Sequence, residues 1–194
     1  MKTEIPMIVT KEGKYNLYNY QSEKELEQMI VEHSSDIFGN NTYYSDTKKR
    51  IYSKAGAGTE PDGYLIDFDK KKLYIIEVEL IRHSLYGHVL PQISKFITAL
   101  ENKKTYDKLV EIFQEELSPN KKMSEKEIKS IIDNREIIII IDDIGDPREE
   151  HNKLFEVINI LSKLAKVRTI PFQTYIKGEN YSQDHVHSFR AFTK

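Results

Sequence analysis

The chain of 194 residues contains no cysteine. Disulfide bonds, thiolate metal sites and cysteine nucleophiles are therefore excluded, and the composition fits a reducing compartment. No stretch approaches the roughly 18 consecutive apolar residues of a membrane-spanning helix. The first residues include Glu4 and Pro6 and lack the basic and then apolar pattern of a signal peptide. These absences predict a cytoplasmic protein without a membrane partner.

An excess of positive charge is absent as well. With 29 basic and 31 acidic residues the formal net charge is -2, which excludes a purely electrostatic binder of nucleic acid. An enzyme of nearly neutral overall charge can still carry a local basic face. No internal repeat, low-complexity tract or linker divides the sequence. We therefore expect a single domain over residues 1–194.

Capping chemistry and apolar spacing predict a first helix that begins after Ser22. Ser22 is followed three residues later by Glu25, which is the pattern of a capping box. Apolar residues then recur at helical spacing as far as Ile37, and Gly39 ends the helix. Residues 4–20 before the helix indicate one or two small strands.

Strands and then helices follow in the middle of the chain. Three runs rich in aromatic and β-branched residues indicate an antiparallel meander over residues 42–53, 63–68 and 73–81. Three helices are expected next, over residues 91–103, 106–117 and 124–132. Pro91 suits the first turn of the first of these, and Ser124 suits the cap of the last.

The final part of the chain contains five consecutive isoleucines, Ile137–Ile141. Such a run fits a central strand covered on both faces, with parallel neighbours and helices on each side. A helix over 148–166, a strand over 167–176 and an edge strand over 185–192 are expected after it. The whole pattern predicts a mixed α/β fold in which an antiparallel region leads into a parallel, doubly covered end.

Acidic residues beside and within the strands are the best candidates for function. Asp62 follows Pro61, whose fixed backbone angle aims the next carboxylate at a defined point. Glu77 and Glu79 share one face of the following strand, because side chains alternate along a strand. Charges within a buried strand are costly unless they are paired or hold a metal. Converging carboxylates are the ligands that Mg²⁺ prefers.

The alternative is that Glu77 and Glu79 lie on a solvent-exposed face. The apolar residues Ile75 and Ile81 have the same parity, and they favour a buried face. Glu79 lies about 6.6 Å beyond Glu77 on a strand that rises ~3.3 Å per residue. It is therefore placed to bind a second ion or to accept a proton from an attacking water.

The sequence here resembles the motif of the PD-(D/E)xK nuclease superfamily. The resemblance rests on Pro61-Asp62, a gap of fourteen residues and then Glu77-Val78-Glu79, with Glu79 in place of the usual lysine. The resemblance implies a restriction-endonuclease-like fold, a mixed sheet core flanked by helices in the order α-β-β-β-α-β with a C-terminal α-β extension. It implies an Mg²⁺-dependent endonuclease that hydrolyses DNA phosphodiester bonds in restriction, phage defence or repair. Mn²⁺ is expected to substitute for Mg²⁺.

The resemblance also assigns roles and partners. Asp62 and Glu77 become metal ligands and catalytic residues, and Glu79 replaces the lysine in handling the attacking water. DNA is the expected partner, with a homodimer or a partner subunit supplying target choice. The absent lysine favours an alternative, a catalytically inactive module of the same fold that binds nucleic acid or a protein. A third possibility is a carboxylate-metal enzyme that is not a nuclease.

Members of the superfamily often carry a further metal-binding glutamate on the helix before the strands, and four acids compete for this place. Glu23 lies about 70° from the centre of the apolar face, whereas Glu27 and Glu32 lie about 110° away on a wheel of 100° per residue. Glu25 is explained by the capping box. We therefore predict Glu23 as the third metal ligand.

In some members the helix after the second acidic strand adds a Gln or Lys to the site. Gln92 is the better candidate here because it flanks the apolar face of its helix, whereas Lys95 points further away. Arg82, His83 and His88 lie between the strand and this helix. Any of the three would supply the positive charge that the missing lysine leaves absent.

Other polar motifs are assigned more ordinary roles. His185 and His187 offer two imidazoles on one strand face, but the sequence shows no third ligand. The glycines at 56–58 are not a phosphate-binding loop, because neither Lys-Ser/Thr nor a helix follows them. The basic runs at 48–50 and 70–72 are expected to be solvated turns, and they are the best candidates for contacts to a phosphate backbone.

Overall fold

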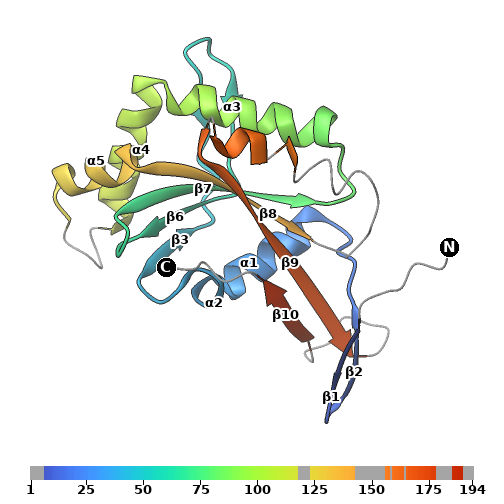
Figure 1. The fold of residues 1–194 in the computed structure, drawn as a ribbon. Helices are drawn as coiled ribbons and strands as arrows, with labels where there is room; N and C mark the ends of the chain where they lie inside the picture. Colours follow the sequence, from blue (N-terminus) through green and yellow to red (C-terminus); the bar gives the residue numbers. More distant parts are fainter. Residues whose placement is uncertain are drawn as a thin grey trace.

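A computed structural model provides the structure of the chain. It describes residues 7–117, 123–142, 156–157, 159–163, 165–177 and 185–189. Within these ranges the chain forms a mixed α/β fold, a sheet with helices on both faces (Figure 1). None of the described helices combines the length and the apolar character needed to cross a membrane.

The main sheet has eight strands in the order β1-β2-β9-β8-β7-β6-β3, with β10 paired to β9. Their bounds are β1 (Met7–Thr10), β2 (Gly13–Leu17), β3 (Thr42–Ser45), β6 (Gly63–Asp67), β7 (Lys72–Leu80), β8 (Arg135–Asp142), β9 (Val167–Lys177) and β10 (His185–Phe189). Strand β8 is parallel to β7 and to β9, and every other pairing is antiparallel. Strands β4 (Ile51–Tyr52) and β5 (Gly58–Thr59) form a separate small sheet.

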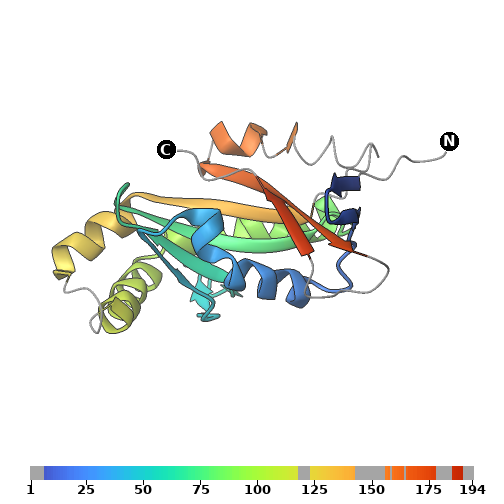
Figure 2. The same cartoon turned by 90° about the horizontal axis from the view of Figure 1, so that it is seen from below.

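Helices cover the two faces of the sheet unequally. Their bounds are α1 (Glu23–Glu32), α2 (Ser34–Phe38), the π-helix η1 (Leu85–Val89), α3 (Leu90–Leu100), α4 (Lys103–Leu117) and α5 (Glu125–Asp133). Figures 1 and 2 show α1 and α2 on one face and α3 on the other. The core residues divide in the same way, because α3, α4 and α5 pack in one apolar cluster and α1 and α2 in another.

The isoleucine strand shows why this division arises. Ile137, Ile139 and Ile141 belong to the cluster under α3, whereas Ile138 and Ile140 belong to the cluster over α1. All five are buried, as expected for a strand at the centre of a sheet. The prediction of an antiparallel region leading into a parallel, doubly covered end is confirmed.

Helix starts agree with the capping patterns. The Ser22 hydroxyl accepts a hydrogen bond from the backbone N–H of Glu25 at 3.3 Å, and Ser124 forms a complete capping box with Glu127. Pro91 lies in the first turn of α3. Local hydrogen bonds of this kind are encoded within four residues, which is why sequence alone predicts them.

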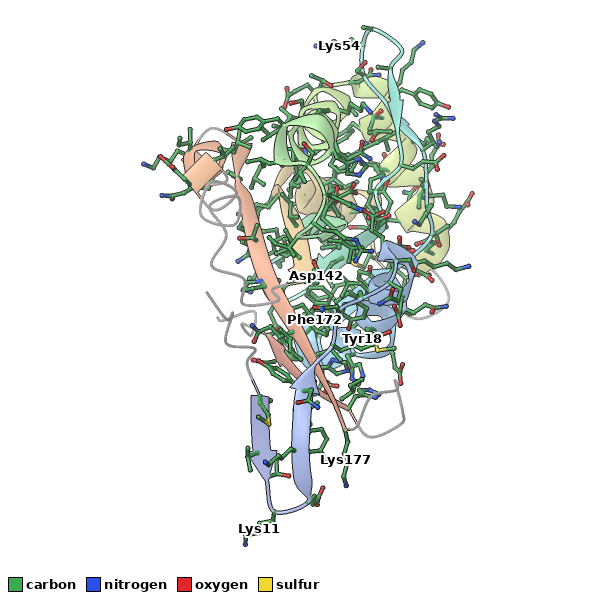
Figure 3. The ribbon with its side chains drawn as sticks, turned by 90° about the vertical axis from the view of Figure 1, so that its right-hand side faces the viewer. Lys11, Tyr18, Lys54, Asp142, Phe172 and Lys177 are labelled. Carbon is green, nitrogen blue, oxygen red and sulfur yellow. The ribbon has the colours of Figure 1, made fainter. Side chains whose placement is uncertain are left out.

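Several boundaries differ from the prediction. The strand expected over 42–53 ends at Ser45, and only Ile51–Tyr52 is extended again, paired with β5. The π-helix η1 precedes α3 and was not predicted. Parts of the expected helix over 148–166 and edge strand over 185–192 lie outside the described residues, as does the region before residue 7. The hairpin of β1 and β2 projects past the other strands of the sheet, with Lys11 at its tip (Figure 3).

Gly63 lies where β6 passes the ring of Tyr44. A Cβ atom at Gly63 would lie 2.5 Å from the Tyr44 hydroxyl oxygen and 2.8 Å from Cζ. We therefore expect Gly63→Ala to lower the free energy of unfolding by about 1–3 kcal/mol in chemical denaturation. Gly58→Ala is the control, because its Cβ would meet the movable side chains of Arg50 and Tyr52. Equal losses in the two variants would contradict the role of Tyr44.

Candidate metal centre

Strand β7 carries two acids into the interior. Glu77 is 5% exposed and Glu79 is 1% exposed. Their side chains share a face with Leu73 and Ile75, which belong to the core under α3. The predicted alternative of a solvent-exposed face is therefore wrong.

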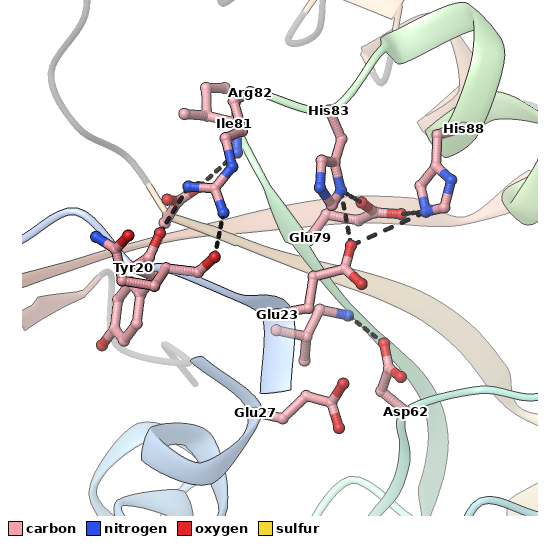
Figure 4. A network of polar contacts seen from close by, with 12 residues as sticks. Tyr20, Glu23, Glu27, Asp62, Glu79, Ile81, Arg82, His83 and His88 are labelled. Atoms are coloured by element: carbon pink, nitrogen blue, oxygen red, sulfur yellow. Dashed lines mark hydrogen bonds and ion pairs between the residues drawn. The ribbon is translucent and has the colours of Figure 1, made fainter. Parts of the chain in front are cut away.

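Asp62 is held against the same strand. Its backbone N–H donates to the carbonyl of Ile76 at 3.1 Å, and its Oδ2 accepts from the backbone N–H of Val78 at 2.9 Å. Figure 4 shows this second contact. Asp62 is thereby anchored through its backbone and one carboxylate oxygen, directly beside the two residues that flank Glu77 in the sequence.

Burial and the neighbouring carboxylates raise the pKa of Glu77 and of Glu79. Burial, then the charges of Asp62, Glu79 and Glu23, raise the pKa of Glu77 well above its ordinary value. Burial, followed by Glu23, raises the pKa of Glu79 as well. Oε2 of Glu77 is buried and receives no hydrogen bond in the described part of the chain. A divalent cation would compensate both the charge and the missing partner, so the residues fit a metal site.

Two histidines complete the arrangement on the side of Glu23. Nδ1 of His83 lies 2.7 Å from Oε1 of Glu23 and 3.1 Å from Oε2 of Glu79. Nε2 of His88 lies 3.3 Å from Oε1 of Glu79. One ligand atom from each of these four residues lies within 4.8 Å of the others (Figure 4). His88 lies in the π-helix η1, which follows β7 in the chain.

Glu23 and Glu79 thus meet the two histidines, and Asp62 and Glu77 lie outside that group of ligand atoms but near enough for the acids to affect the pKa of Glu77. Gln92 is left aside. The side-chain oxygen of Gln92 lies 3.5 Å from Nζ of Lys95, and among the described residues no hydrogen bond joins Gln92 to the acids. The metal and catalytic roles of all five residues stay predictions, because position alone does not test them.

Arg82 has a structural role. Its guanidinium donates to the backbone carbonyls of Tyr20 and Gln21 at 2.6 and 2.7 Å. These bonds fasten the segment before α1 to the end of β7 and so fix the position of Glu23 (Figure 4). Of the three basic candidates between β7 and α3, only the two histidines contact the acids in the described structure.

Lys48 contacts the acids in a way that the sequence did not predict. It was assigned to a solvated turn, yet its Nζ lies 2.9 Å from Oδ1 of Asp62 and 2.9 Å from Oε2 of Glu27. Antiparallel pairing of β3 with β6 brings the loop after Ser45 beside Asp62. No local sequence signal specifies this pairing, which depends on a sheet register.

A hollow of about 350 Å³ opens beside Asp62 and Lys48. Its walls come from α1, β3 and the loop that follows β3, with Lys24, Glu27, Gln28, Val31, Glu32, Tyr44 and Asp46 as further lining residues. Lys48 itself is 46% exposed at the opening. The volume lies within the ordinary range for a small-molecule site.

Comparison with protein families gave one result. A family model described as the KAP family P-loop domain matches residues 12–171, most of the chain. No match was found among curated proteins or among solved structures.

The family match corrects the functional predictions. The chain is not a member of the PD-(D/E)xK superfamily, and the predictions of a DNA endonuclease and of its inactive counterpart are wrong. The motif fixes only a few acidic positions, whereas the family model covers residues 12–171. The broader expectations of an α/β fold, an enzyme and Mg²⁺ agree with a P-loop NTPase. DNA binding and a homodimer or partner subunit stay predictions.

A P-loop holds nucleotide phosphates with the pattern G-x-x-x-x-G-K-[ST], ahead of a helix. Gly58 and Gly63 have the required spacing, but Tyr64 and Leu65 follow them. The two glycines lie in strands β5 and β6, and a Cβ at Gly63 would meet Tyr44. These residues do not fit a P-loop phosphate cradle. A nucleotide would have to bind elsewhere on the chain.

Proposed function

The chain belongs to the KAP family of P-loop domains, and on that basis we propose that it hydrolyses a phosphate bond of a nucleotide with Mg²⁺ held by acidic residues. One observation carries the proposal. Glu77 is a buried carboxylate with an oxygen that has no hydrogen-bond partner among the described residues, and burial, followed by the charges of Asp62, Glu79 and Glu23, raises its pKa. Anionic groups gathered in this way are stabilised by a divalent cation, which also binds the phosphates of a nucleotide.

Asp62 and Glu77 would hold the ion, and Glu23 would complete the set. Bound Mg²⁺ would polarise the phosphoryl group and neutralise charge that develops on it. The imidazoles of His83 and His88 beside Glu79 favour Mn²⁺ as a substitute, since Mn²⁺ accepts nitrogen ligands more readily.

The side chains of the protein supply the remaining steps. Burial raises the pKa of Glu79 to about 9, so in the metal-free protein its carboxyl keeps a proton near neutral pH. A bound cation would favour the ionised form, and the Glu79 carboxylate would then be placed to take a proton from the attacking water. Nδ1 of His83 lies 3.1 Å from the Glu79 carboxylate and orients it. Lys48, at the opening of the hollow, would bind a phosphate oxygen in exchange for Glu27 or Asp62.

The proposal is tested by phosphate release from a panel of nucleoside triphosphates. Protein stripped of metal with EDTA should be inactive, and Mg²⁺ or Mn²⁺ should restore release. Absence of release from every nucleotide with both ions, in protein shown to be folded by circular dichroism, would overturn the proposal. Cleavage of plasmid DNA by the same preparation would contradict the family assignment.

We expect Lys48→Ala to raise the KM for the nucleotide by roughly 10–100-fold. A hydrogen bond to a charged group contributes about 1.5–3 kcal/mol, and Lys48 is the cation that contacts Asp62. Steady-state phosphate release measures the change. Lys49→Ala is the control, because among the described residues the ion pairs to Asp62 and Glu27 are made by Lys48 and not by Lys49. Similar effects of both substitutions would indicate general electrostatic attraction and not a specific contact.

A further inference from the structure

Three histidines from distant parts of the chain meet on the face of the sheet that α1 covers. His33 is the C-cap of α1, and His185 and His187 lie two residues apart on β10, so they share one face of that strand. One nitrogen from each ring lies within 4.8 Å of the other two. The ring centroids of His33 and His187 are 4.5 Å apart, and those of His185 and His187 are 4.7 Å apart.

Hydrogen bonds orient two of the rings. Nδ1 of His33 lies 3.3 Å from Oδ2 of Asp36, and Nδ1 of His187 lies 2.8 Å from the hydroxyl oxygen of Thr174. Thr174 is fully buried on β9 and directly opposite His187 in the β9–β10 pairing. A histidine that binds a metal commonly uses its other nitrogen in such a bond, which fixes the ring and its tautomer.

The opposite nitrogens of these two rings lack partners. Nε2 of His33 and Nε2 of His187 are both buried and unbonded in the described structure. A buried polar atom without a partner destabilises the folded protein, so a ligand bound by these two nitrogens would stabilise it.

We propose that His33, His185 and His187 bind a Zn²⁺ ion that fastens β10 to the C-terminal end of α1. Three imidazole nitrogens suit Zn²⁺ and its neighbours in the transition series and do not suit Mg²⁺, which requires oxygen ligands. Figure 1 shows β10 beside α1, so an ion between them joins the C-terminal strand to the helix.

The site is separate from the metal centre of β7. Glu23 begins α1 and His33 follows its end, which places them about 15 Å apart along a helix that rises 1.5 Å per residue. Strand β10 also lies outside the matched residues 12–171. The histidine site therefore does not depend on the proposed hydrolysis.

Binding of Zn²⁺ to metal-free protein is measured by calorimetry, and Co²⁺ serves as a spectroscopic probe of nitrogen ligands. We expect one ion per chain from this site near neutral pH, with visible Co²⁺ bands. His187→Ala and His33→Ala should each weaken binding on the order of 100-fold. Thr174→Val should weaken it by roughly 10-fold, since only the orientation of His187 is lost.

A matched control separates this site from the other cluster that contains histidine. The double substitution His83→Ala with His88→Ala removes the imidazoles beside Glu79 and should leave the Co²⁺ bands of the proposed site unchanged. If the bands vanish in that double variant and persist in His187→Ala, the proposal is overturned. Zn²⁺ should also slow hydrogen exchange in β10 of the wild-type protein. Unchanged exchange at saturating Zn²⁺ would overturn the proposal that the ion fastens β10 to α1.

Discussion

Asp62→Asn is expected to lower kcat for Mg²⁺-dependent nucleotide hydrolysis by roughly 100–1000-fold, the loss typical when one preorganised electrostatic group is removed from an active site. Asparagine has nearly the same shape, and its side-chain oxygen can still accept from the backbone N–H of Val78, so the fold around β6 and β7 should persist. What disappears is the negative charge beside Glu77 that would attract the ion. The measurement is phosphate release at saturating nucleotide.

Glu60→Gln provides the matched control for that experiment. Glu60 lies two residues before Asp62, but its carboxylate is exposed and pairs at 3.9 Å with Arg50. We expect its activity to stay within about twofold of wild type, because exposed ion pairs contribute little. Full activity in Asp62→Asn, or an equal loss in Glu60→Gln, would show that hydrolysis takes place elsewhere.

Glu79→Gln is expected to stabilise the metal-free protein at alkaline pH. The pKa of Glu79 is raised from 4.5 to about 9 in the folded chain by burial and by Glu23. Between these pH values the folded protein keeps a proton that the unfolded chain has lost, so stability falls as pH rises and reaches its minimum above pH 9. Glutamine removes the part of this dependence that Glu79 contributes and leaves the part due to Glu77, whose pKa is raised as well. The substitution should add about 1–3 kcal/mol there, or roughly 2–10 °C in Tm.

Thermal unfolding in EDTA across that pH range measures the effect. Adding Mg²⁺ should stabilise the wild type more at high pH, since the ion binds the ionised carboxylates, and it should stabilise Glu79→Gln much less. Glu115→Gln, an exposed position on α4, should follow the wild-type curve. A wild-type pH slope in Glu79→Gln would mean that another group carries the proton.

Local and periodic features of the fold were predictable from the sequence. The caps at Ser22 and Ser124 and the doubly buried run Ile137–Ile141 depend on residues only a few positions apart. The convergence of Glu77 and Glu79 with Asp62 followed from strand alternation and one hairpin. Boundaries near β4 and η1 were not predictable, because long-range packing determines where a strand ends or a helix gains a residue.

Function was the weaker part of the prediction. Three acidic positions indicated a metal centre, and a buried cluster of acids is present, but the same positions did not identify the family. A pair of acids two residues apart places carboxylates on one face in any strand, whatever the fold that surrounds it. Chemistry at the site and membership of a family are therefore separate inferences.

The sequence by itself determined the mixed α/β order of elements, the helix caps, the central apolar strand and the presence of acids on one face of β7. Only the tertiary structure decided which cations and imidazoles join them. Lys48 reaches Asp62 through the β3–β6 register, and His33 meets His185 and His187 across more than 150 residues of chain. Contacts of this kind depend on how strands pair and helices dock, and no short segment of the sequence specifies either.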